Sequence, residues 1–561
     1  MSDWHERLSP PRYRMKVEKN VWVTMRDGVR LCVDVYRPDA EGKFPALLGL
    51  SPYSKDVQKL PVHEYPTDRE LGNGGIEAGD SEYFVSRGYV HVIADSRGTG
   101  LSEGAYRVFS LKEQQDGYDL IEWMATQSWC SGGVGMIGSS YFAMIQLLVA
   151  AQQPPHLKAI FPVDSTTDFY RHWGWHGGIL HSSFLSTWWE GSLVAHTADE
   201  PDLSGEELKR IVAAQKAHRD IGCNPRLWKA LEFPWTNPHL FDVLTHPLDG
   251  PYYRERSANA KFDRIKVPAY LIGRWQATYI HLQGSFQSYN GIEAPCRLLI
   301  TNPESGVGFN RPWHENHDLV LRWYDHWLKG NDTGVLDEAP IKLYIQGRGH
   351  YRDEKEWPLA RTQWKKLYLG VNGTLTEQGP GWNEKPDSFV NAAPLMPGQK
   401  VPALRYATAP LTEDTELTGP LALYLHAAIT GEDTNWIVEV EDLHPDGSTT
   451  RAAIGWLKAS HRETDEAKSK PYQPFHPHAR ELPLTPGKPE LYAIDLREMC
   501  YVFKAGHAIQ LLVKAQDAPW EGASYIYRIS LHLPPNRTMK HTVFHTPEHP
   551  SYLMIPVIPK G

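Results

Sequence analysis

The stretch Gly135-Met136-Ile137-Gly138-Ser139-Ser140-Tyr141-Phe142-Ala143 decides the fold of this 561-residue chain. Its first residues read as a strand, and a helical pattern begins at Tyr141. Small residues precede Ser140, as is typical where a strand turns sharply into a helix and the two pack closely. The pattern is G-x-S-x-x-A, with its last small residue one place later than in the common G-x-S-x-G. It predicts that Ser140 projects from a strand-to-helix turn, where a serine can serve as a nucleophile.

The sequence around this turn predicts a mostly parallel sheet. Apolar runs at 44–50 and 89–95 are typical of strands covered on both faces, and helical stretches at 114–124 and 141–152 alternate with them. Residues 15–38 alternate polar and apolar around Asp27-Gly28, which predicts a hairpin. Strand patterns return at 267–273 and 296–300, and a long helix ends near residue 330.

Two segments break this alternation. Residues 172–260 are Trp-rich and amphipathic, which predicts a helical cap inserted into the sheet domain. After Asp332-Thr333-Gly334 the chain has period-two runs with many Pro and Gly residues, which predict an all-β sandwich. We therefore expect an α/β sheet domain in two parts, 1–171 and 261–335, with the cap at 172–260 and the β-sandwich at 336–561.

Composition excludes several kinds of partner. The formal charge of −9 leaves no basic surface for nucleic acid or anionic lipid. Five widely separated cysteines without a CxxC pair indicate neither disulfides nor a zinc site. The N-terminus lacks a signal-peptide core, and no stretch approaches 18 apolar residues, so we expect a cytoplasmic protein. We expect no cofactor. The sequence does not decide whether the protein forms a homo-oligomer.

A nucleophilic serine also needs donors for the oxyanion that forms on the acyl group. The backbone N–H of Tyr141 at the start of the helix is one candidate. Tyr53, in the loop after an early strand, carries a phenol that could be the second. From its position alone, Tyr53 is more typical of a packing tyrosine.

Five stretches, one of which contains the serine turn, together resemble a known family. They are Pro52-Tyr53, residues 95–104 (DSRGTGLSEG), Trp129 through Tyr141, residues 322–330 (RWYDHWLKG), and a β-region set at 433–447, 455–462 and 506–507. In this order they are similar to the cocaine esterase and X-prolyl dipeptidyl-peptidase group, which includes α-amino-acid ester hydrolases. The resemblance covers nearly the whole chain and is far more specific than the serine pattern.

The resemblance implies an α/β-hydrolase domain, a helical cap above the active site and a C-terminal jelly roll packed beside both. It implies that Tyr53 donates its hydroxyl to the oxyanion together with the N–H of Tyr141. It also implies that residues 95–104 form a structural turn, held by hydrogen bonds of Arg97.

The sequence departs from the family at both partners of the serine. The family acid lies in a Gly-Gly-Trp-x-Asp segment, which here reads Gly273-Arg274-Trp275-Gln276-Ala277. The family histidine lies in Gly-Pro-Trp-x-His, which here reads Asn302-Pro303-Glu304-Ser305-Gly306. Ala277 and Gly306 therefore stand where the acid and the base are expected.

Three other histidines, His281, His314 and His317, lie near enough in the sequence to replace the base. We favour His317 and then His314, which share a helix face at i, i+3 spacing; the alternative is that both are solvated. For the acid we favour Asp164 after the strand at 159–163. Glu304 and Glu315 compete with it, and Asp168 is more typical of a structural role.

The same two histidines could share a metal ion, but no third ligand follows at a recognisable interval, so we expect no metal. Aromatic and histidine residues of the cap and of the loop after the penultimate strand suggest an apolar acyl pocket, although such residues pack against a protein body as often. These pocket candidates are Trp173, Trp175, His176, Trp188, Trp275 and His281.

The leading hypothesis is a serine hydrolase that cleaves a small ester or amide through an acyl-enzyme on Ser140, with a relocated histidine base. One alternative is a non-hydrolytic relative, an acyltransferase or lyase-like enzyme with a rebuilt proton relay. The other is a catalytically silent ligand-binding protein. No acidic cluster is evident that would bind a free amino terminus, which ranks an esterase slightly above a dipeptidyl-peptidase.

Overall fold

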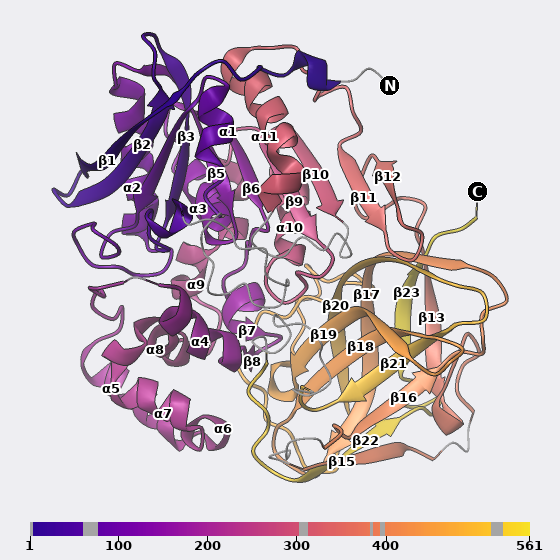
Figure 1. Cartoon of the computed structure of the whole chain (residues 1–561). Helices are drawn as coiled ribbons and strands as arrows, with labels where there is room; N and C mark the ends of the chain where they lie inside the picture. The colour runs from indigo at the N-terminus through magenta and orange to yellow at the C-terminus, as the bar shows by residue number, and fades with distance from the viewer. Residues whose placement is uncertain are drawn as a thin grey trace.

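The computed structural model describes residues 4–59, 77–193, 195–301, 312–381, 385–392, 399–517 and 531–560. Side chains at 191–192 and 312–315 lie outside this description. Figure 1 shows two large parts, a helix-flanked sheet with a helical region beneath it and a β domain beside both. No helix among the described residues is long and apolar enough to cross a membrane.

The first part is built on a ten-stranded sheet in the order β1-β2-β4-β3-β5-β6-β9-β10-β11-β12. Its middle, from β4 to β11, is parallel, and antiparallel strands close both edges. The strands are β1 (Met15–Thr24), β2 (Arg30–Pro38), β3 (Phe44–Ser51), β4 (Val90–Asp95), β5 (Cys130–Ser139), β6 (Leu157–Val163), β9 (Ala269–Arg274), β10 (Cys296–Thr301), β11 (Ile341–Ile345) and β12 (His350–Glu354). The sheet thus runs beyond residue 335, where we expected the β domain to begin.

Helices cover both faces of this sheet, which explains its continuous apolar strands. Alternate residues of one strand enter different cores, since Met136 belongs to the core under α2 and α3 and Ile137 to the core under α1 and α11. The helices are α1 (Ser81–Ser86), α2 (Leu111–Thr126), α3 (Tyr141–Ala150), α10 (Leu282–Gly291) and α11 (Pro312–Lys329).

A helical cap lies between β6 and β9, as the sequence predicts (Figure 1). It begins with the π-turn η4 and a two-stranded ribbon and ends with η6. Its elements are η4 (Tyr170–Gly174), β7 (Trp175–His176), β8 (Ile179–Leu180), α4 (Ser182–Ser192), α5 (Gly205–Ala217), α6 (Arg219–Gly222), α7 (Pro225–Glu232), α8 (Pro238–Thr245), α9 (Pro251–Arg256) and η6 (Ala258–Arg264).

The C-terminal part is an all-β sandwich whose eleven strands form one folded sheet, β15-β22-β17-β20-β19-β18-β21-β16-β14-β13-β23, with a further β17–β23 pairing. The expected fold class, an α/β-hydrolase domain with a helical cap and a β-sandwich, is confirmed. The strands are β13 (Gln363–Gly370), β14 (Thr374–Thr376), β15 (Asp387–Asn391), β16 (Ala403–Ala407), β17 (Thr415–Ile429), β18 (Asn435–Leu443), β19 (Thr449–Lys458), β20 (Glu490–Phe503), β21 (Ala508–Lys514), β22 (Met539–Phe544) and β23 (Tyr552–Val557).

The β domain packs tightly against the cap and the sheet domain. A Cβ atom added at Gly177 would lie 2.0 Å from the carbonyl oxygen of Trp456, so only glycine fits at this contact. The backbone N–H of Gln346, just after β11, donates to the carbonyl of Cys500 at 3.2 Å, and the N–H of Val502 donates back at 2.9 Å. The first contact joins the β domain to the cap, and the second joins it to the sheet domain.

Candidate active site

Ser140 lies at a sharp turn between β5 and α3. Its φ of 56° and ψ of −116° fall in a region that a non-glycine residue adopts only when its surroundings hold it there. A Cβ atom added at Gly138 would lie 2.1 Å from the Cβ of Phe142, so the small residue two places before the serine is a steric requirement. The geometry is that of a nucleophile elbow.

Tyr53 follows β3 and lies beside this elbow. The indole N–H of Trp188 donates to the Tyr53 hydroxyl oxygen at 2.9 Å, so the phenol proton stays available to another acceptor. The Ser140 side chain is a hydrogen-bonding neighbour of the same phenol, and burial holds the pKa of Tyr53 well above its ordinary value. Tyr53 is therefore a neutral phenol beside the serine, with its proton available for donation.

Tyr141 begins α3, so its backbone N–H has no acceptor within the helix. Its side chain points elsewhere, because the hydroxyl donates to Glu113 at 2.7 Å and accepts from Tyr106 at 2.9 Å. Its backbone and the phenol of Tyr53 can together supply the two donors of an oxyanion hole.

His281 is the imidazole next to the serine. Its Nε2 lies 3.5 Å from the Oγ of Ser140, and its Nδ1 lies 3.4 Å from the Oγ1 of Thr166. The Thr166 hydroxyl donates to the carbonyl of Ile280 at 2.6 Å, so towards the imidazole it can only accept. The proton therefore belongs on Nδ1, which leaves the lone pair of Nε2 facing Ser140.

The loop after β9 brings His281 to this position. The carbonyl of Ala277, at the family's acid position, accepts from the backbone N–H of His281 at 3.0 Å, which places the histidine one helical turn further on. A Cβ atom added at Gly284 would lie 2.3 Å from the carbonyl oxygen of Ser165. That glycine lets the start of α10 approach the segment after β6, where Thr166 lies.

Asp164 is near His281 but bonded to a different partner. Its Oδ2 accepts from the Nε of Arg274 at 2.6 Å, and the Nη2 of Arg274 completes a buried ion pair. Burial is the largest influence on His281 and lowers its pKa to about 4; the charge of Asp164 acts in the opposite direction and Arg274 in the same direction as burial. His281 is thus neutral at pH 7, as a general base must be.

Glu77 adds a second buried carboxyl group that sequence reasoning missed. Burial raises its pKa to about 8, with Arg274 lowering and Asp164 raising it. Its carbonyl accepts from the N–H of Ser139 at 2.9 Å, which ties it to the elbow. Glu77 lies before α1 in a segment with several other acidic residues, so nothing in the sequence singles it out. Two other residues of the site lie beside positions that the sequence singled out. Thr166 is two residues after Asp164, and Arg274 is in the segment that lacks the family acid.

The other two histidine candidates lie on α11. The ring of His317 stacks on Tyr83 at 4.5 Å between centroids and contacts Phe84 edge-on at 6.2 Å, both on α1. His314 has its backbone in α11, but its side chain lies outside the described residues, as does that of Glu315. Residues 302–311, with Glu304 and Gly306, are likewise outside the description.

Asp168 holds the loop after β6 in place. Its carboxylate accepts from Asn259 at 3.0 Å and pairs with Arg171 at 3.0 Å. The turn at 95–104 is also structural, since Arg97 donates to Asp116 at 2.6 Å and to Asp27 at 3.0 Å.

The pocket candidates divide into two groups. Trp188 and Trp173 pack edge to face at 5.0 Å, and Trp188 contacts Tyr53 directly, which places this pair beside the elbow. The indole N–H groups of Trp175 and Trp275 donate at 2.8 Å to Tyr253 and to the carbonyl of Tyr344, which is a packing arrangement.

The remaining pocket candidate, His176, is buried at the cap. Its Nδ1 lies 2.7 Å from the Nε2 of His532 in the β domain, and its ring contacts Trp456 at 4.9 Å. His176 therefore joins the cap to the β domain.

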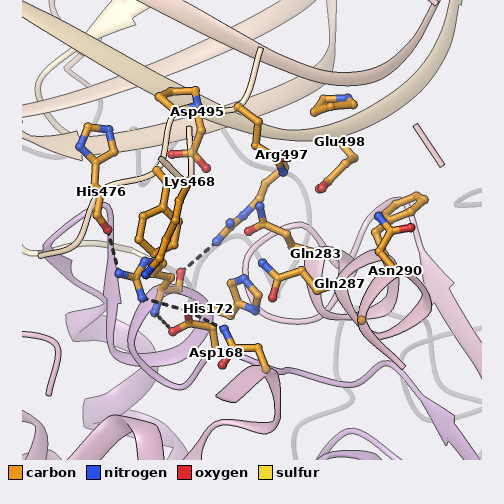
Figure 2. Close-up of a pocket in the computed structure, with 18 of the residues that line it drawn as sticks. Asp168, His172, Gln283, Gln287, Asn290, Lys468, His476, Asp495, Arg497 and Glu498 are labelled. Carbon is orange, nitrogen blue, oxygen red and sulfur yellow. Dashed lines mark hydrogen bonds and ion pairs between the residues drawn. The ribbon is translucent and has the colours of Figure 1, made fainter. Parts of the chain in front are cut away.

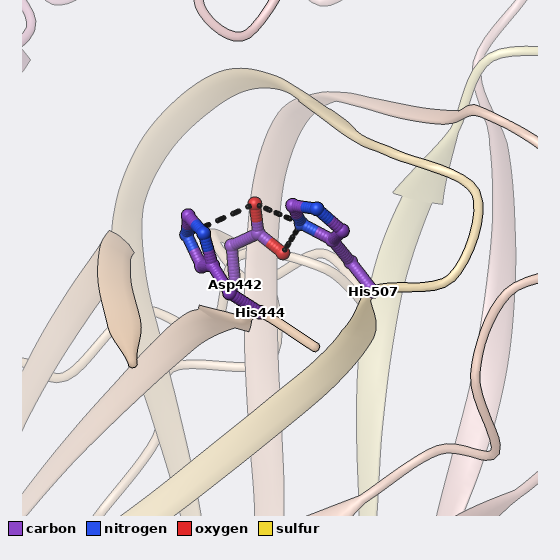
Figure 3. Close-up of side chains that lie close together, drawn as sticks. All are labelled: Asp442, His444 and His507. Carbon is purple, nitrogen blue, oxygen red and sulfur yellow. Dashed lines mark hydrogen bonds and ion pairs between the residues drawn. The ribbon is translucent and has the colours of Figure 1, made fainter. Parts of the chain in front are cut away.

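One group of side chains in the described part of the chain has the spacing of metal ligands, Asp442, His444 and His507 (Figure 3). The carboxylate of Asp442 already accepts from the Nδ1 of His507 at 2.9 Å and from the hydroxyl of Tyr501 at 3.0 Å. These bonds tie the end of β18 to the turn before β21.

A buried serine on a nucleophile elbow, two candidate oxyanion donors and an adjacent neutral imidazole on this fold are the features of a serine hydrolase of ester or amide bonds. The family model of X-Pro dipeptidyl-peptidase (S15 family) matches residues 27–304, and that of the X-Pro dipeptidyl-peptidase C-terminal non-catalytic domain matches residues 333–554. The chain belongs to the S15 X-Pro dipeptidyl-peptidase family.

Individual relatives agree with this assignment. The chain is 27% identical to the cocaine esterase of Rhodococcus sp. (strain MB1 Bresler), covering 97% of this chain and 98% of that protein. A CocE/NonD family hydrolase from Staphylococcus aureus superposes with a TM-score of 0.79 at 24% identity, covering 97% and 94% of the two chains. An α-amino acid ester hydrolase gives 0.73 at 21% identity, covering 98% and 97%. The two solved structures share the whole fold, including the β domain.

Proposed function

We propose that the protein is an esterase that transfers the acyl group of a small ester to Ser140, with His281 as the general base. The observation that carries this is the 3.5 Å approach of the His281 Nε2 to the Ser140 Oγ at the elbow. Such contacts are often long before substrate binds. The family membership supports hydrolysis over the acyltransferase, lyase-like and silent-binder readings.

The first half-reaction follows from these positions. The Ser140 Oγ attacks the acyl carbon while its proton passes to the Nε2 of His281. The negative charge that forms on the carbonyl oxygen is received by the Tyr53 hydroxyl and the Tyr141 N–H. As the intermediate collapses, the bond to the alcohol oxygen breaks and His281 returns its proton to the departing alcohol.

The second half-reaction regenerates the serine. A water molecule gives its proton to the Nε2 of His281 and attacks the acyl carbon of the ester on Ser140. His281 then protonates the Ser140 Oγ as the acid leaves. In both halves Thr166 holds the ring orientation, and the negative charge of Asp164 favours the imidazolium that forms briefly.

An ester with an apolar or aromatic acyl group fits the surroundings best. Trp188 lies against the oxyanion donor Tyr53, and Trp173 packs on Trp188, so aromatic surface borders the reacting carbon. The similarity of the whole chain to a cocaine esterase supports an ester over a peptide. This preference is tested by comparing kcat/KM for p-nitrophenyl acetate, butyrate and benzoate with kcat/KM for an aminoacyl-proline anilide. Faster cleavage of the anilide would reject it.

A fluorophosphonate probe tests the nucleophile directly. Intact-mass and peptide mapping should find one adduct, on Ser140, and Ser140→Ala should abolish both labelling and ester hydrolysis. Ser139→Ala is the matched control, because this neighbouring buried serine should be dispensable. An unlabelled, folded wild-type protein would reject the proposal.

A further inference from the structure

A cavity of about 360 Å³ lies where the cap, α10 and the β domain meet (Figure 2). Neither Ser140 nor His281 lines it, so it is separate from the elbow. Polar and charged groups line it, including His172, Arg497 and Glu498 (Figure 2). Aromatic rings line it as well, of which Phe286 and Trp357 stack at 4.3 Å between centroids.

An irregular register in β20 directs two neighbouring charged side chains into this space. Gly419 on β17 pairs with Met499 and Leu421 pairs with Leu496, so the single residue Pro420 stands opposite both Arg497 and Glu498. An extra residue of this kind is a β-bulge, which re-aims side chains. Leu496 and Met499 enter the apolar core of the sandwich, and Arg497 and Glu498 both line the cavity.

Among the described residues Arg497 makes no direct ion pair, although the charges of Asp495, Glu498 and Asp168 act on it from a longer distance. It is 5% exposed, yet no carboxylate oxygen of the described residues lies within 4.0 Å of its guanidinium. Its Nη2 donates to the carbonyl of Arg171 at 3.1 Å, its Nε makes no hydrogen bond in that part of the chain, and Trp456 packs under it at 5.3 Å. By contrast Arg171, in the same cavity, is paired with Asp168 and Asp249 at 3.0 and 2.8 Å.

A buried guanidinium without a carboxylate is costly, and a bidentate carboxylate is its best partner. The groups around Arg497 leave room for that partner. The Oε2 of Glu498 is buried and makes no hydrogen bond among the described residues. His172 is buried too, and its ring has Gln283 as a hydrogen-bonding neighbour, although no contact of its ring nitrogens with that part of the chain meets strict hydrogen-bond geometry. Burial lowers the pKa of His172 to about 3 and raises that of Glu498 to about 7, so the Glu498 carboxyl can donate a proton to an acceptor near neutral pH.

We propose that this cavity is a binding site for a small aromatic carboxylate, with the carboxylate on Arg497 and the ring against the aromatic side chains that line the cavity, such as Phe286. Gln283 and Gln287 of α10 face the same space and can add amide hydrogen bonds (Figure 2). The site is independent of the acyl transfer proposed for Ser140, and its occupancy would bridge the cap, α10 and the β domain.

Calorimetric titration of the Ser140→Ala protein with phenylacetate tests the site without turnover. Phenylacetate should bind at least 10-fold more tightly than its neutral isostere phenylacetamide. Arg497→Gln should weaken phenylacetate binding about 10- to 100-fold, the range for loss of a charged hydrogen-bonding partner. Arg480→Gln is the matched control, because Arg480 is exposed and pairs with Glu463 on the surface. It should bind phenylacetate as the parent protein does.

Two further measurements keep the outcome decisive. Thermal unfolding checks that Arg497→Gln is folded; if it is not, Arg497→Lys, which keeps the charge but loses the paired donors, should bind about 10-fold more weakly. A crystal soaked with 4-bromophenylacetate should show the anomalous bromine signal near Phe286. Equal binding of phenylacetamide, no binding at millimolar concentration, or bromine only beside residue 140 would overturn the proposal.

Discussion

Two buried histidines of this molecule have contrasting partners. In the β domain, the Nδ1 of His532 lies 2.9 Å from a carboxylate oxygen of Asp517, the contact that usually orients a catalytic histidine. Beside the nucleophile, the Nδ1 of His281 instead lies 3.4 Å from the hydroxyl of Thr166. The proposal of His281 as the base therefore rests on its distance to Ser140 and not on a contact with a carboxylate.

The contrast has an electrostatic consequence. A carboxylate in direct contact stabilises the imidazolium form of a histidine, whereas a hydroxyl only orients the neutral ring. Asp164 supplies negative charge near His281, but Arg274 is bonded to it and offsets much of that charge. His281 is thus held as a weak base that stays deprotonated well below neutral pH.

The largest expected effect is on kcat/KM, and it should distinguish mutation of His281 from mutation of His532. His281→Ala should lower kcat/KM for p-nitrophenyl acetate about 10²- to 10⁴-fold, because general-base catalysis is lost. His532→Ala should leave kcat/KM within about threefold but lower the free energy of unfolding by about 3–5 kcal/mol, since the buried Asp517 loses its partner. Steady-state kinetics and urea denaturation distinguish the two results. A loss in His317→Ala as large as that expected for His281→Ala would move the base to α11.

Tyrosine hydroxyls give the second test. Tyr53→Phe should lower kcat about 10²- to 10³-fold, the usual cost of one oxyanion donor. Tyr141→Phe removes only the hydroxyl bonded to Glu113 and keeps the backbone N–H, so kcat should hold while stability falls by about 1 kcal/mol. If both variants lost kcat equally, the Tyr53 phenol would not be the donor. The measurements are burst-phase kinetics and thermal unfolding.

Thr166 should have a smaller effect, because it orients the base without touching substrate. Thr166→Val keeps the shape but removes the acceptor for the His281 Nδ1–H, and kcat should fall about 10-fold with KM unchanged. Thr166→Ser keeps the hydroxyl and should recover most of the activity. Equal kcat in all three proteins would show that the ring is oriented by its other neighbours.

The serine elbow could be predicted from the sequence because its requirements are local. Gly138 is needed for the close contact with Phe142, only four residues further along the chain, and Ser140 lies two residues after Gly138. The role of Tyr53 came from the family resemblance and is supported by its Trp188 hydrogen bond. The mostly parallel sheet, the inserted cap and the β-sandwich followed from the alternation of strand and helix patterns, the α/β-hydrolase assignment followed from the family resemblance, and the fold class is confirmed.

The partners of the serine could not be predicted in the same way. His281 meets Thr166 only because the loop after β9 and the segment after β6 converge in space, through a close contact at Gly284 that no spacing in the sequence reveals. Sequence reasoning favoured His317 from its place after the last expected strand. The tryptophan content likewise could not distinguish pocket residues from packing residues, since Trp188 borders the elbow whereas the indole of Trp275 donates to a backbone carbonyl.

The response to pH is the smallest expected effect. With the pKa of His281 lowered to about 4 by burial, kcat/KM should hold its plateau as pH falls from 7 to about 5 and reach half its value near pH 4. The free energy of unfolding should begin to fall at a higher pH than kcat/KM does. Burial also lowers the pKa values of His172 and His239 to about 3, so below pH 6.5 the unfolded chain binds protons that the folded chain does not.

The free energy of unfolding should therefore fall as pH drops from about 6.5 towards 4, before the base itself is protonated. Urea denaturation at several pH values measures the free energy of unfolding. Initial rates measure kcat/KM, with activity checked after return to pH 7.5. A kcat/KM limb centred near pH 6.5 in fully recoverable protein would indicate a base in an exposed or carboxylate-bonded setting. That result would remove the contrast between His281 and the histidines that carry a carboxylate partner.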